Sequence, residues 1–373
     1  MLSYDSRKRS FAIARNWRHR RISLGSAMAT LDDVAKRAGV SLSTASYVLS
    51  GKRPISEKTR QRVLAAMDDL DFRPNNQGRA LASGRSRTVA LLYPARNALF
   101  ATMPLEFVVS AAAEAERKGY ALTLATTGTP DEQMLSMLDR GFVDGYILME
   151  IALVDSRVEL LKRRQLPFAM IGRCRDNTGV NFVDFDFDDA IAQAVDHLQA
   201  LEHRSIALVV RDPGDADDGY GPSVRLTHAF QCESRRRGIN GRIVYCEAAP
   251  AAGSAILDEV LATEPTPTAL LCANAESTIG LLRAIAERGL SIPRDLSLFG
   301  LFSPRAAETL AIPITGVDFP VEEMGRCGVD FLIEFLEGGE SIAPKQKVIR
   351  SVVSDRGSTG RPPELPVSLQ TGR

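Results

Sequence analysis

The chain has 373 residues, of which 45% are hydrophobic and 25% charged, a composition typical of globular proteins with two or three domains. It has no run of 18 apolar residues, and residues 1–28 lack the apolar stretch of a secretory signal, so we predict a cytoplasmic protein without a membrane partner. The five cysteines are scattered and include no CxxC pair, which indicates neither a disulfide framework nor a metal site, and no cofactor is expected.

The formal net charge is zero, but the charges are distributed unevenly along the chain. Residues 1–28 carry seven Lys/Arg against one acidic residue, residues 29–88 carry eleven against six, and residues 89–373 carry 28 against 39. Phosphate attracts a basic segment and repels an acidic one. The pattern therefore indicates a DNA-binding module attached to a body that does not bind DNA.

The Arg-rich segment 1–28 is compatible with a DNA-contacting basic arm or a transit-like peptide. Met28 stands two residues before the first clear helix cap. We therefore expect residues 1–28 to be a disordered extension, or to result from a start position assigned too early.

Residues 29–74 are expected to form three short helices. Thr30-Leu-Asp-Asp33 resembles a capping box, and Gly39 suits a left-handed helix cap. Ser41 is expected to cap a second helix that ends at Gly51. The apolar face of the first helix comprises Leu31, Val34, Ala35 and Ala38.

The third helix is expected to begin at Ser56 and to end before Pro74. Its residues at helical spacing, which would cover the first two helices, are Val63, Leu64, Met67 and Leu70. Three such helices form either an ordinary bundle or a helix-turn-helix, whose second helix enters the major groove. In the second case Leu42, Ser43 and Tyr47 would face the bases.

The segment TLDDVAKRAGVSLSTASYVLSGKRPISEKTRQRVLAAMDDLDFRPNNQGRALASG closely resembles the DNA-binding headpiece of the lactose-repressor/galactose-repressor family. The resemblance implies a sequence-specific transcriptional regulator, in particular a repressor, and not an enzyme. It implies base contacts from Leu42, Ser43 and Tyr47. The positions that it implies for phosphate contacts all carry hydroxyls, which can donate to phosphate without selecting sequence: Ser46, Ser50, Ser56 and Thr59.

Residues 75–87 correspond to the family's hinge, which becomes helical only on operator DNA. The resemblance implies that Leu81 wedges into the minor groove and kinks the duplex. Gly78 replaces the family's usual alanine, and glycine disfavours a helix by about 1 kcal/mol, so hinge folding is expected to be weaker here. The alternative is that Leu81 is an ordinary linker residue.

From residue 88 onward, apolar strand-like runs such as TVALLYP, VDGYILME and TALLCAN alternate with helix-like stretches. This alternation predicts parallel sheets with crossover helices, and two sets of them would form two lobes with a ligand held at the carboxyl ends of the strands. A dehydrogenase would show the same alternation. Neither GxGxxG after a strand nor GxxxxGK[ST] occurs, which disfavours dinucleotide and P-loop binding.

The resemblance continues through PTALLCANAESTIGLLRAIAERGLSIPRDLSLFG to the terminal SDRGST, and implies a two-lobed α/β domain similar to periplasmic sugar-binding proteins. The fold class is thus an all-α headpiece plus this sensor domain, residues 88–358. We place the first lobe at 88–186 and 316–343 and the second at 187–315 and 344–358. Residues 359–373 are expected to be a Pro-rich tail.

The predicted pocket departs from the family pattern at several positions. Leu226 stands where the family commonly has an arginine, although Arg225 lies beside it. The acids commonly found after two of the strands are replaced by Ala275 and Phe302. Either the effector has fewer hydroxyls than a simple sugar, or other residues supply the hydrogen bonds.

Candidate effector contacts carried over by position are Leu99, Phe100, Arg173, Tyr220, Arg225, Asn274 and Phe302. The two phenylalanines could equally be core residues, and the two arginines could be solvated surface charges. His197, His203 and His228 suggest catalysis, but no Ser or Cys elbow motif accompanies them, and the resemblance makes the first two structural.

The favoured mechanism is a homodimer, or a higher assembly, that binds a near-palindromic operator and is controlled by a sugar or sugar derivative between the lobes. Whether the effector releases DNA or promotes binding stays open, because either sign needs only a differential affinity for two states. The rivals are a solute-binding protein for uptake, disfavoured by the headpiece, and an α/β enzyme, for which no nucleophile, metal or cofactor motif is present.

Overall fold

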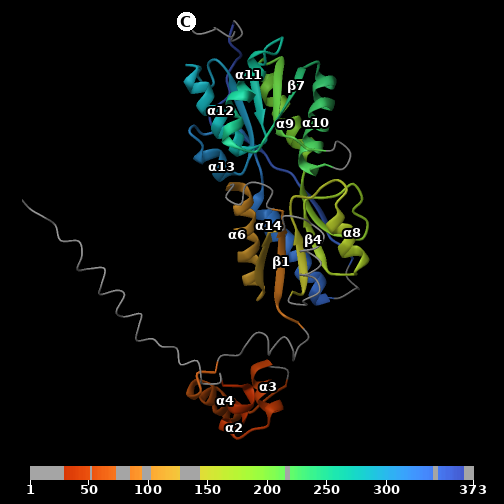
Figure 1. Ribbon diagram of the computed structural model, residues 1–373, viewed down its shortest axis with the longest axis vertical. Helices are drawn as coiled ribbons and strands as arrows, with labels where there is room; N and C mark the ends of the chain where they lie inside the picture. Colours follow the sequence, from red (N-terminus) through yellow and green to blue (C-terminus); the bar gives the residue numbers. More distant parts are fainter. Residues whose placement is uncertain are drawn as a thin grey trace, which may run out of the picture. The chain divides into compact units, whose positions relative to one another are not determined.

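The computed structural model divides into two compact units, Met1–Gly84 and Arg85–Arg373, each described here by itself (Figure 1). Segment 1–28, most of the predicted hinge with Gly78 and Leu81, and the loop with Leu99 and Phe100 lie outside the described residues. The structure describes residues 29–50, 53–72, 85–94, 102–126, 143–214, 219–338 and 343–364.

The first unit contains the three predicted helices, α2 (Leu31–Ala38), α3 (Leu42–Ser50) and α4 (Glu57–Asp69). The capping box forms: the Thr30 hydroxyl accepts from the Asp33 amide at 3.3 Å, and the Asp33 carboxylate accepts from the Thr30 amide at 2.9 Å. Gly39 ends α2 with φ of 63°, a left-handed conformation in which glycine pays no Cβ penalty.

A small apolar core holds these helices together. Its buried members are Val34, Ala35, Ala38, Ala45, Val63 and Ala66. The prediction that Leu64 contributes to this core is wrong, since Leu64 is 43% exposed. Successive helical residues are rotated by about 100°, so Ala66 and Met67 share the face of Val63 while Leu64 points beside it.

The second unit contains two six-stranded sheets, each built mainly of parallel strands. The first is entirely parallel in the order β11 (Gln346–Ile349), β5 (Asn181–Phe185), β4 (Phe168–Ile171), β3 (Gly145–Leu148), β1 (Thr88–Tyr93) and β2 (Ala121–Thr126). The second has the order β12 (Val353–Ser354), β10 (Gly316–Asp318), β9 (Ser297–Phe302), β8 (Ala269–Cys272), β6 (Ser205–Arg211) and β7 (Asn240–Cys246). Only β12 runs antiparallel to its neighbour.

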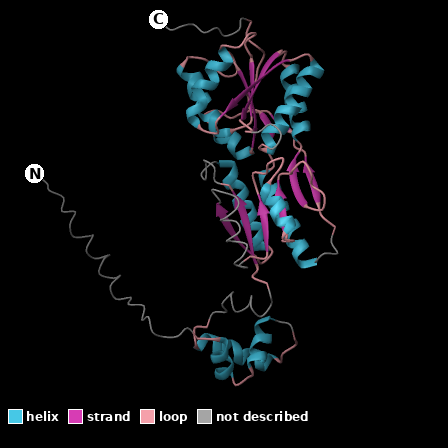
Figure 2. Cartoon of the chain, turned by 45° about the vertical axis from the view of Figure 1, so that its right-hand side comes forward, coloured by secondary structure: helices cyan, strands magenta, loops and turns pink. Residues whose placement is uncertain are grey.

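Helices cover both faces of each sheet, so alternate residues of one strand enter different cores (Figures 1 and 2). In β1, Val89 and Leu91 share a core with α6 and α14, whereas Ala90 and Leu92 share one with α8. In the second lobe α9 and α10 cover one face, and α11 and α12 cover the other. The helices are α6 (Thr102–Arg117), α8 (Ser156–Arg163), α9 (Phe187–Ala200), α10 (Gly221–Arg237), η1 (Pro250–Ala252), α11 (Gly253–Leu261), α12 (Ala275–Glu287), α13 (Pro304–Thr309) and α14 (Val321–Gly338).

The chain crosses between the two sheets three times: between β5 and α9, between β10 and α14, and between β11 and β12. Two predicted lobe boundaries are corrected by the pairing. Residues 316–318 form β10, which pairs with β9 of the second sheet, and residues 346–349 form β11, which pairs with β5 of the first. Both strands are short, so their sheet membership depends on tertiary pairing and not on sequence pattern.

Phenylalanines pack together where the chain crosses. Phe185 ends β5, Phe187 begins α9, and Phe319 follows β10. The Phe319 ring lies 4.5 Å from the Phe185 ring and 6.1 Å from the Phe187 ring, centroid to centroid. Phe107 of α6 contacts Phe319 edge to face at 6.3 Å. Such aromatic pairs add to simple burial, so two of the crossings share one packed cluster.

The contact between α12 and η1 leaves no room for a side chain at Gly280. A Cβ there would overlap the backbone carbonyl of Pro250, which cannot move aside as a flexible side chain could. We expect Gly280→Ala to lower the free energy of unfolding by about 1–3 kcal/mol through overpacking, measured by urea denaturation. Arg283→Ala, an exposed change on the same helix, should stay within about 0.5 kcal/mol. Equal stability of the two variants would contradict this packing account.

Candidate functional site

The predicted base-contacting side chains all lie on α3, Leu42 and Ser43 in its first turn and Tyr47 in its second half. Leu42 is 50% exposed and Ser43 is exposed. Tyr47 is half-buried, and the guanidinium of Arg53 lies 5.3 Å from its ring centroid. Ser41 caps this helix by accepting from the Thr44 amide at 3.2 Å. Leu42 and Ser43 are therefore accessible to a partner that contacts the first turn of α3.

The predicted phosphate-contacting hydroxyls have different surroundings. Ser46 is half-buried on α3, and the side chain of Ser50 lies outside the described residues. At the start of α4 the Ser56 hydroxyl accepts from the Thr59 amide at 3.3 Å, and the two hydroxyl oxygens are 2.9 Å apart. Ser56 and Thr59 therefore define the helix N-terminus, where the helix dipole also favours an anion.

A cavity of ≈ 650 Å³ lies between the two lobes of the second unit. Residues at the carboxyl ends of strands from both sheets line it, which is the ordinary ligand position in open α/β sheets. The contributors include Tyr93 at the end of β1, Glu150 after β3, Arg211 at the end of β6 and Asn274 after β8. The volume is that of a small-molecule site.

Glu150 is held in an uncommon backbone conformation on the first-lobe side. Its φ is 54°, in the left-handed region that non-glycine residues rarely adopt. The buried guanidinium of Arg157 donates to the Glu150 carbonyl at 3.1 Å and to the Met149 carbonyl at 3.0 Å, and pairs with Asp155 at 2.7 Å. Because strained residues persist only where their surroundings impose them, this clamp gives the Glu150 carboxylate a defined position.

The Glu150 carboxylate connects the two lobes. It accepts from Arg211 at 2.8 Å and from the Tyr220 hydroxyl at 3.0 Å, and the Arg211 guanidinium lies 4.4 Å from the Tyr220 ring centroid. Burial, and then the Glu150 charge, raise the pKa of Tyr93 to about 12 and raise that of Tyr220 well above its ordinary value. Both phenols therefore stay protonated and can donate hydrogen bonds.

A second charged cluster lies at Asp184, which lines the cavity from β5 and is 2% exposed. Arg173 of the first lobe lies 3.0 Å from its carboxylate, and Arg225 of α10 lies 4.0 Å away. Arg225 also donates across the lobes to the carbonyls of Arg173 at 2.7 Å and Cys174 at 3.2 Å. Burial raises the pKa of Asp184 to about 6, and the two arginines oppose that rise.

Comparison with known proteins identifies two domains. A model of bacterial regulatory proteins of the lacI family matches residues 30–75, and a model of periplasmic binding protein-like domains matches residues 195–359. The HTH-type transcriptional repressor PurR of Klebsiella pneumoniae (strain 342) is 28% identical over 316 residues, covering 82% of this chain and 90% of that protein. Residues 30–75 thus carry a DNA-binding domain of the lacI family, and residues 195–359 belong to a periplasmic binding protein-like domain.

Solved structures show the same two-lobed architecture. The Lac repressor dimer bound to operator and the anti-inducer ONPF has a TM-score of 0.76 at 24% identity, covering 90% of this chain and 100% of that one. The transcriptional regulator CelR–cellobiose complex has a TM-score of 0.65 at 26% identity, covering 88% and 99%. With the lacI-family DNA-binding domain and the periplasmic binding protein-like domain in one chain, the protein is a DNA-binding transcriptional regulator with an effector-binding domain.

The cavity brings together only some of the effector contacts expected from the family pattern. Tyr220 and Asn274 line it, whereas Arg173 and Arg225 are not among its lining residues and pair with Asp184, which is. Phe302 does not line it: the side chain is 1% exposed and lies in the core of the second lobe. Its ring lies over Gly300, where a Cβ would meet it, so the strand end turns Phe302 inward.

Six charged residues of the cavity were not predicted from the sequence: Glu150, Asp184, Arg211, Asp212, Glu247 and Glu276. Glu150 and Arg211 each stand at or just after the end of a strand-like run, and this position is the signal that would have found them. Asp184 lies within β5, a strand interrupted by polar residues, and no sequence signal marks it. Leu226 does line the cavity, at the position where the family commonly has arginine.

The histidines of the second lobe have structural surroundings. His203 is fully buried, and its ring nitrogens lie 2.8 Å from the Thr268 hydroxyl and 2.8 Å from the Gly360 carbonyl. His197 lies 2.8 Å from the Thr359 hydroxyl. The stretch 359–360, expected to belong to the tail, is thus bound to the second lobe. His228 is exposed on α10.

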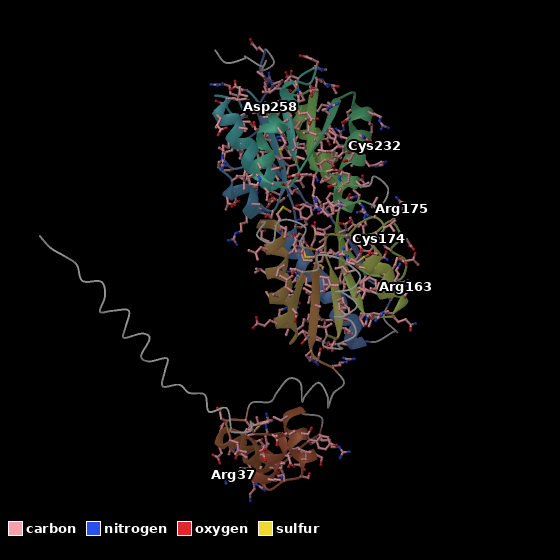
Figure 3. The ribbon with its side chains drawn as sticks, in the orientation of Figure 1. Arg37, Arg163, Cys174, Arg175, Cys232 and Asp258 are labelled. Carbon is pink, nitrogen blue, oxygen red and sulfur yellow. The ribbon has the colours of Figure 1, made fainter. Side chains whose placement is uncertain are left out.

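The five cysteines are unpaired; Figure 3 shows Cys174 on the first lobe and Cys232 on the second. Among the described residues no helix is long and apolar enough to cross a membrane. The same residues contain no group of three or more His, Cys, Asp or Glu side chains arranged to hold a metal ion.

The raised pKa of Asp184 predicts a specific pH dependence. An acid whose pKa is higher in the folded state binds a proton on folding, so its contribution to stability falls as pH rises from 3.8 to about 6. Across that pH window we expect the free energy of unfolding of wild type to fall by about 1–3 kcal/mol relative to that of Asp184→Asn, measured by urea denaturation at each pH. If wild type instead became more stable relative to the variant as pH rises, the arginine charges would outweigh burial in setting the pKa of Asp184.

Proposed function

We propose that the chain is a repressor that binds operator DNA as a homodimer. Its affinity for the operator falls or rises when a small molecule occupies the cavity. The observation that carries this proposal is the combination, in one chain, of a helix-turn-helix unit and a cavity built between two lobes. The Lac repressor, to which the fold is similar, is a dimer bound to operator. The proposed place of action is the cytoplasm, where a bacterial regulator meets DNA.

On the DNA side, α3 would enter the major groove with Leu42, Ser43 and Tyr47 against base edges. Ser46, Ser50, Ser56 and Thr59 would contact phosphates and fix the register. Three features support this division: Leu42 and Ser43 are exposed, Arg53 lies over Tyr47, and Ser56 and Thr59 stand at a helix N-terminus. Leu81 keeps its proposed role as the minor-groove wedge.

On the effector side, the cavity combines aromatic walls with oriented hydrogen-bonding groups, which is the chemistry that holds a sugar or a sugar derivative. Tyr220 and Asn274 are the contacts that we retain, and Glu150 and Arg211 are added. Arg173 and Arg225 act indirectly through Asp184, and Leu99 and Phe100 stay proposals. CelR, a similar regulator, has been solved with cellobiose.

Coupling between effector binding and DNA binding would depend on the contacts that join the lobes. Besides the Glu150 and Arg225 contacts, the Gly221 amide donates to the Ile151 carbonyl at 3.0 Å, and Ser303 donates to Glu106 at 2.9 Å. A ligand that prefers one arrangement of these contacts shifts the population of the two lobe arrangements. The hinge residues 75–87 would carry that shift to the headpiece.

We propose no enzymatic activity: the relatives matched are transcriptional regulators. The rival that shares the two-lobed fold is a solute-binding protein for uptake. The two are distinguished by titrating DNA from upstream of the chain's own gene with the full-length protein, with and without candidate sugars. A regulator binds this DNA, and a sugar changes the midpoint; an uptake protein binds no DNA. Affinity should also fall steeply with salt, because phosphate contacts release counterions.

Substitutions on α3 should separate base recognition from phosphate binding. We expect Tyr47→Ala to change the preferred base at one half-site position by about 1–3 kcal/mol, and Ser46→Ala to weaken binding to all sequences alike. Gln61→Ala, an exposed change on α4, is the control. The measurement is fluorescence anisotropy against a set of operators substituted one base pair at a time. Identical profiles for the Tyr47 and Ser46 variants would refute the division of roles.

A further inference from the structure

Three carboxylates of the second lobe line the cavity without forming an ion pair within the described part of the chain. Asp212 follows β6, Glu247 follows β7, and Glu276 lies in the first turn of α12, which follows β8. Asp212 accepts from the Gly214 amide at 2.8 Å, a contact that leaves its charge uncompensated. Glu276 is half-buried, and the other two are exposed.

The sheet topology places these three residues side by side. Strands β8, β6 and β7 are consecutive neighbours in the second sheet and run parallel. Their carboxyl ends therefore lie at one edge, and the residues that follow them project toward the same space. The N-terminus of α12 favours an acid at Glu276, but it does not account for Asp212 or Glu247, neither of which lies in a helix.

The basic groups near the cavity are already engaged. Arg211 pairs with Glu150 at 2.8 Å and lies over the Tyr220 ring. Arg173 and Arg225 pair with Asp184. Among the described lining residues, Arg211 is the single Lys or Arg, against five carboxylates. The lining therefore has an excess of negative charge on its second-lobe side.

This excess of negative charge is electrostatically unfavourable, and a positively charged ligand relieves it. Like charges that face one cavity repel one another, and partial exclusion of water strengthens that repulsion. Burial and then the Glu150 charge raise the pKa of Tyr93, which lines the cavity from the first lobe, and the Glu276 charge adds to that rise. Tyr93 and Phe319 also line the cavity, and aromatic rings attract an ammonium group.

We propose that the effector carries a protonated amine, which Asp212, Glu247 and Glu276 bind, and that the cavity rejects anionic ligands. An amino sugar or a small polyamine has this chemistry, whereas a sugar acid or a sugar phosphate does not. The inference rests on the proposed function, because it names the ligand class of the same cavity.

The test compares ligands that are matched in shape but differ in charge. Full-length protein is titrated by calorimetry with glucosamine, glucose and glucuronate, and then with putrescine, 1,4-butanediol and succinate. The proposal expects a cation to bind in at least one series, at least tenfold more tightly than its neutral counterpart, and neither anion to bind measurably. It is overturned if a neutral or anionic compound binds as tightly as its cationic counterpart, or if neither cation binds.

Charge-neutralising variants locate the site. Charge-assisted hydrogen bonds are worth about 1.5–3 kcal/mol, so Glu276→Gln and Asp212→Asn should each weaken binding of the cation about tenfold or more. Glu287→Gln, at the opposite and exposed end of α12, is the matched control and should bind like wild type. Equal affinity of wild type, Glu276→Gln and Asp212→Asn would overturn the assignment.

The same proteins are titrated with the upstream DNA, with and without each compound. If glucosamine or putrescine binds but leaves DNA affinity unchanged, the ligand class holds and the proposed function fails. If glucose or glucuronate alone changes DNA affinity, the proposed function holds and the ligand class fails.

Discussion

The three crossings of the chain between two parallel sheets are the constraint on which the sensor domain depends. Because of these crossings, the carboxyl ends of the strands of one lobe face those of the other. Residues at these strand ends, from both lobes, therefore line one cavity. The packing of Phe319 against Phe185 and Phe187 joins two of the crossings. A change in the angle between the lobes must therefore alter the conformation of these segments. A ligand that favours one lobe angle thus affects the whole sensor domain.

A ligand in the cavity has to replace or strengthen the polar contacts that join the two lobes. Glu150 reaches Arg211 and Tyr220, and Arg225 reaches the carbonyls of Arg173 and Cys174. These contacts are partly buried, where hydrogen bonds are stronger and unpaired groups are more costly than in water. Small changes in ligand charge should thus alter lobe closure strongly, and an acidic second-lobe wall gives the cavity a preference by charge as well as by shape.

Local sequence signals predicted the helices of the headpiece and most strands, because capping residues, glycine and apolar runs act over a few residues. They could not assign β10 and β11 to their sheets, since these strands are short and partner choice is a tertiary property. Family position placed Tyr220 and Asn274 in the cavity lining but misplaced Phe302, because a side chain at a strand end can turn either way. Asp184 was missed because its partners, Arg173 and Arg225, are not its neighbours in the sequence, and Arg225 belongs to the other lobe. Nothing in the local sequence shows that this carboxylate is buried.

If the cavity and the headpiece are thermodynamically coupled, the coupling must be reciprocal. Ligand affinity of the full-length protein should be measured by calorimetry in the absence and in the presence of saturating operator DNA. We predict that operator DNA changes ligand affinity by the same factor, in the same direction, as the ligand changes operator affinity. Identical ligand affinity with and without operator would contradict it.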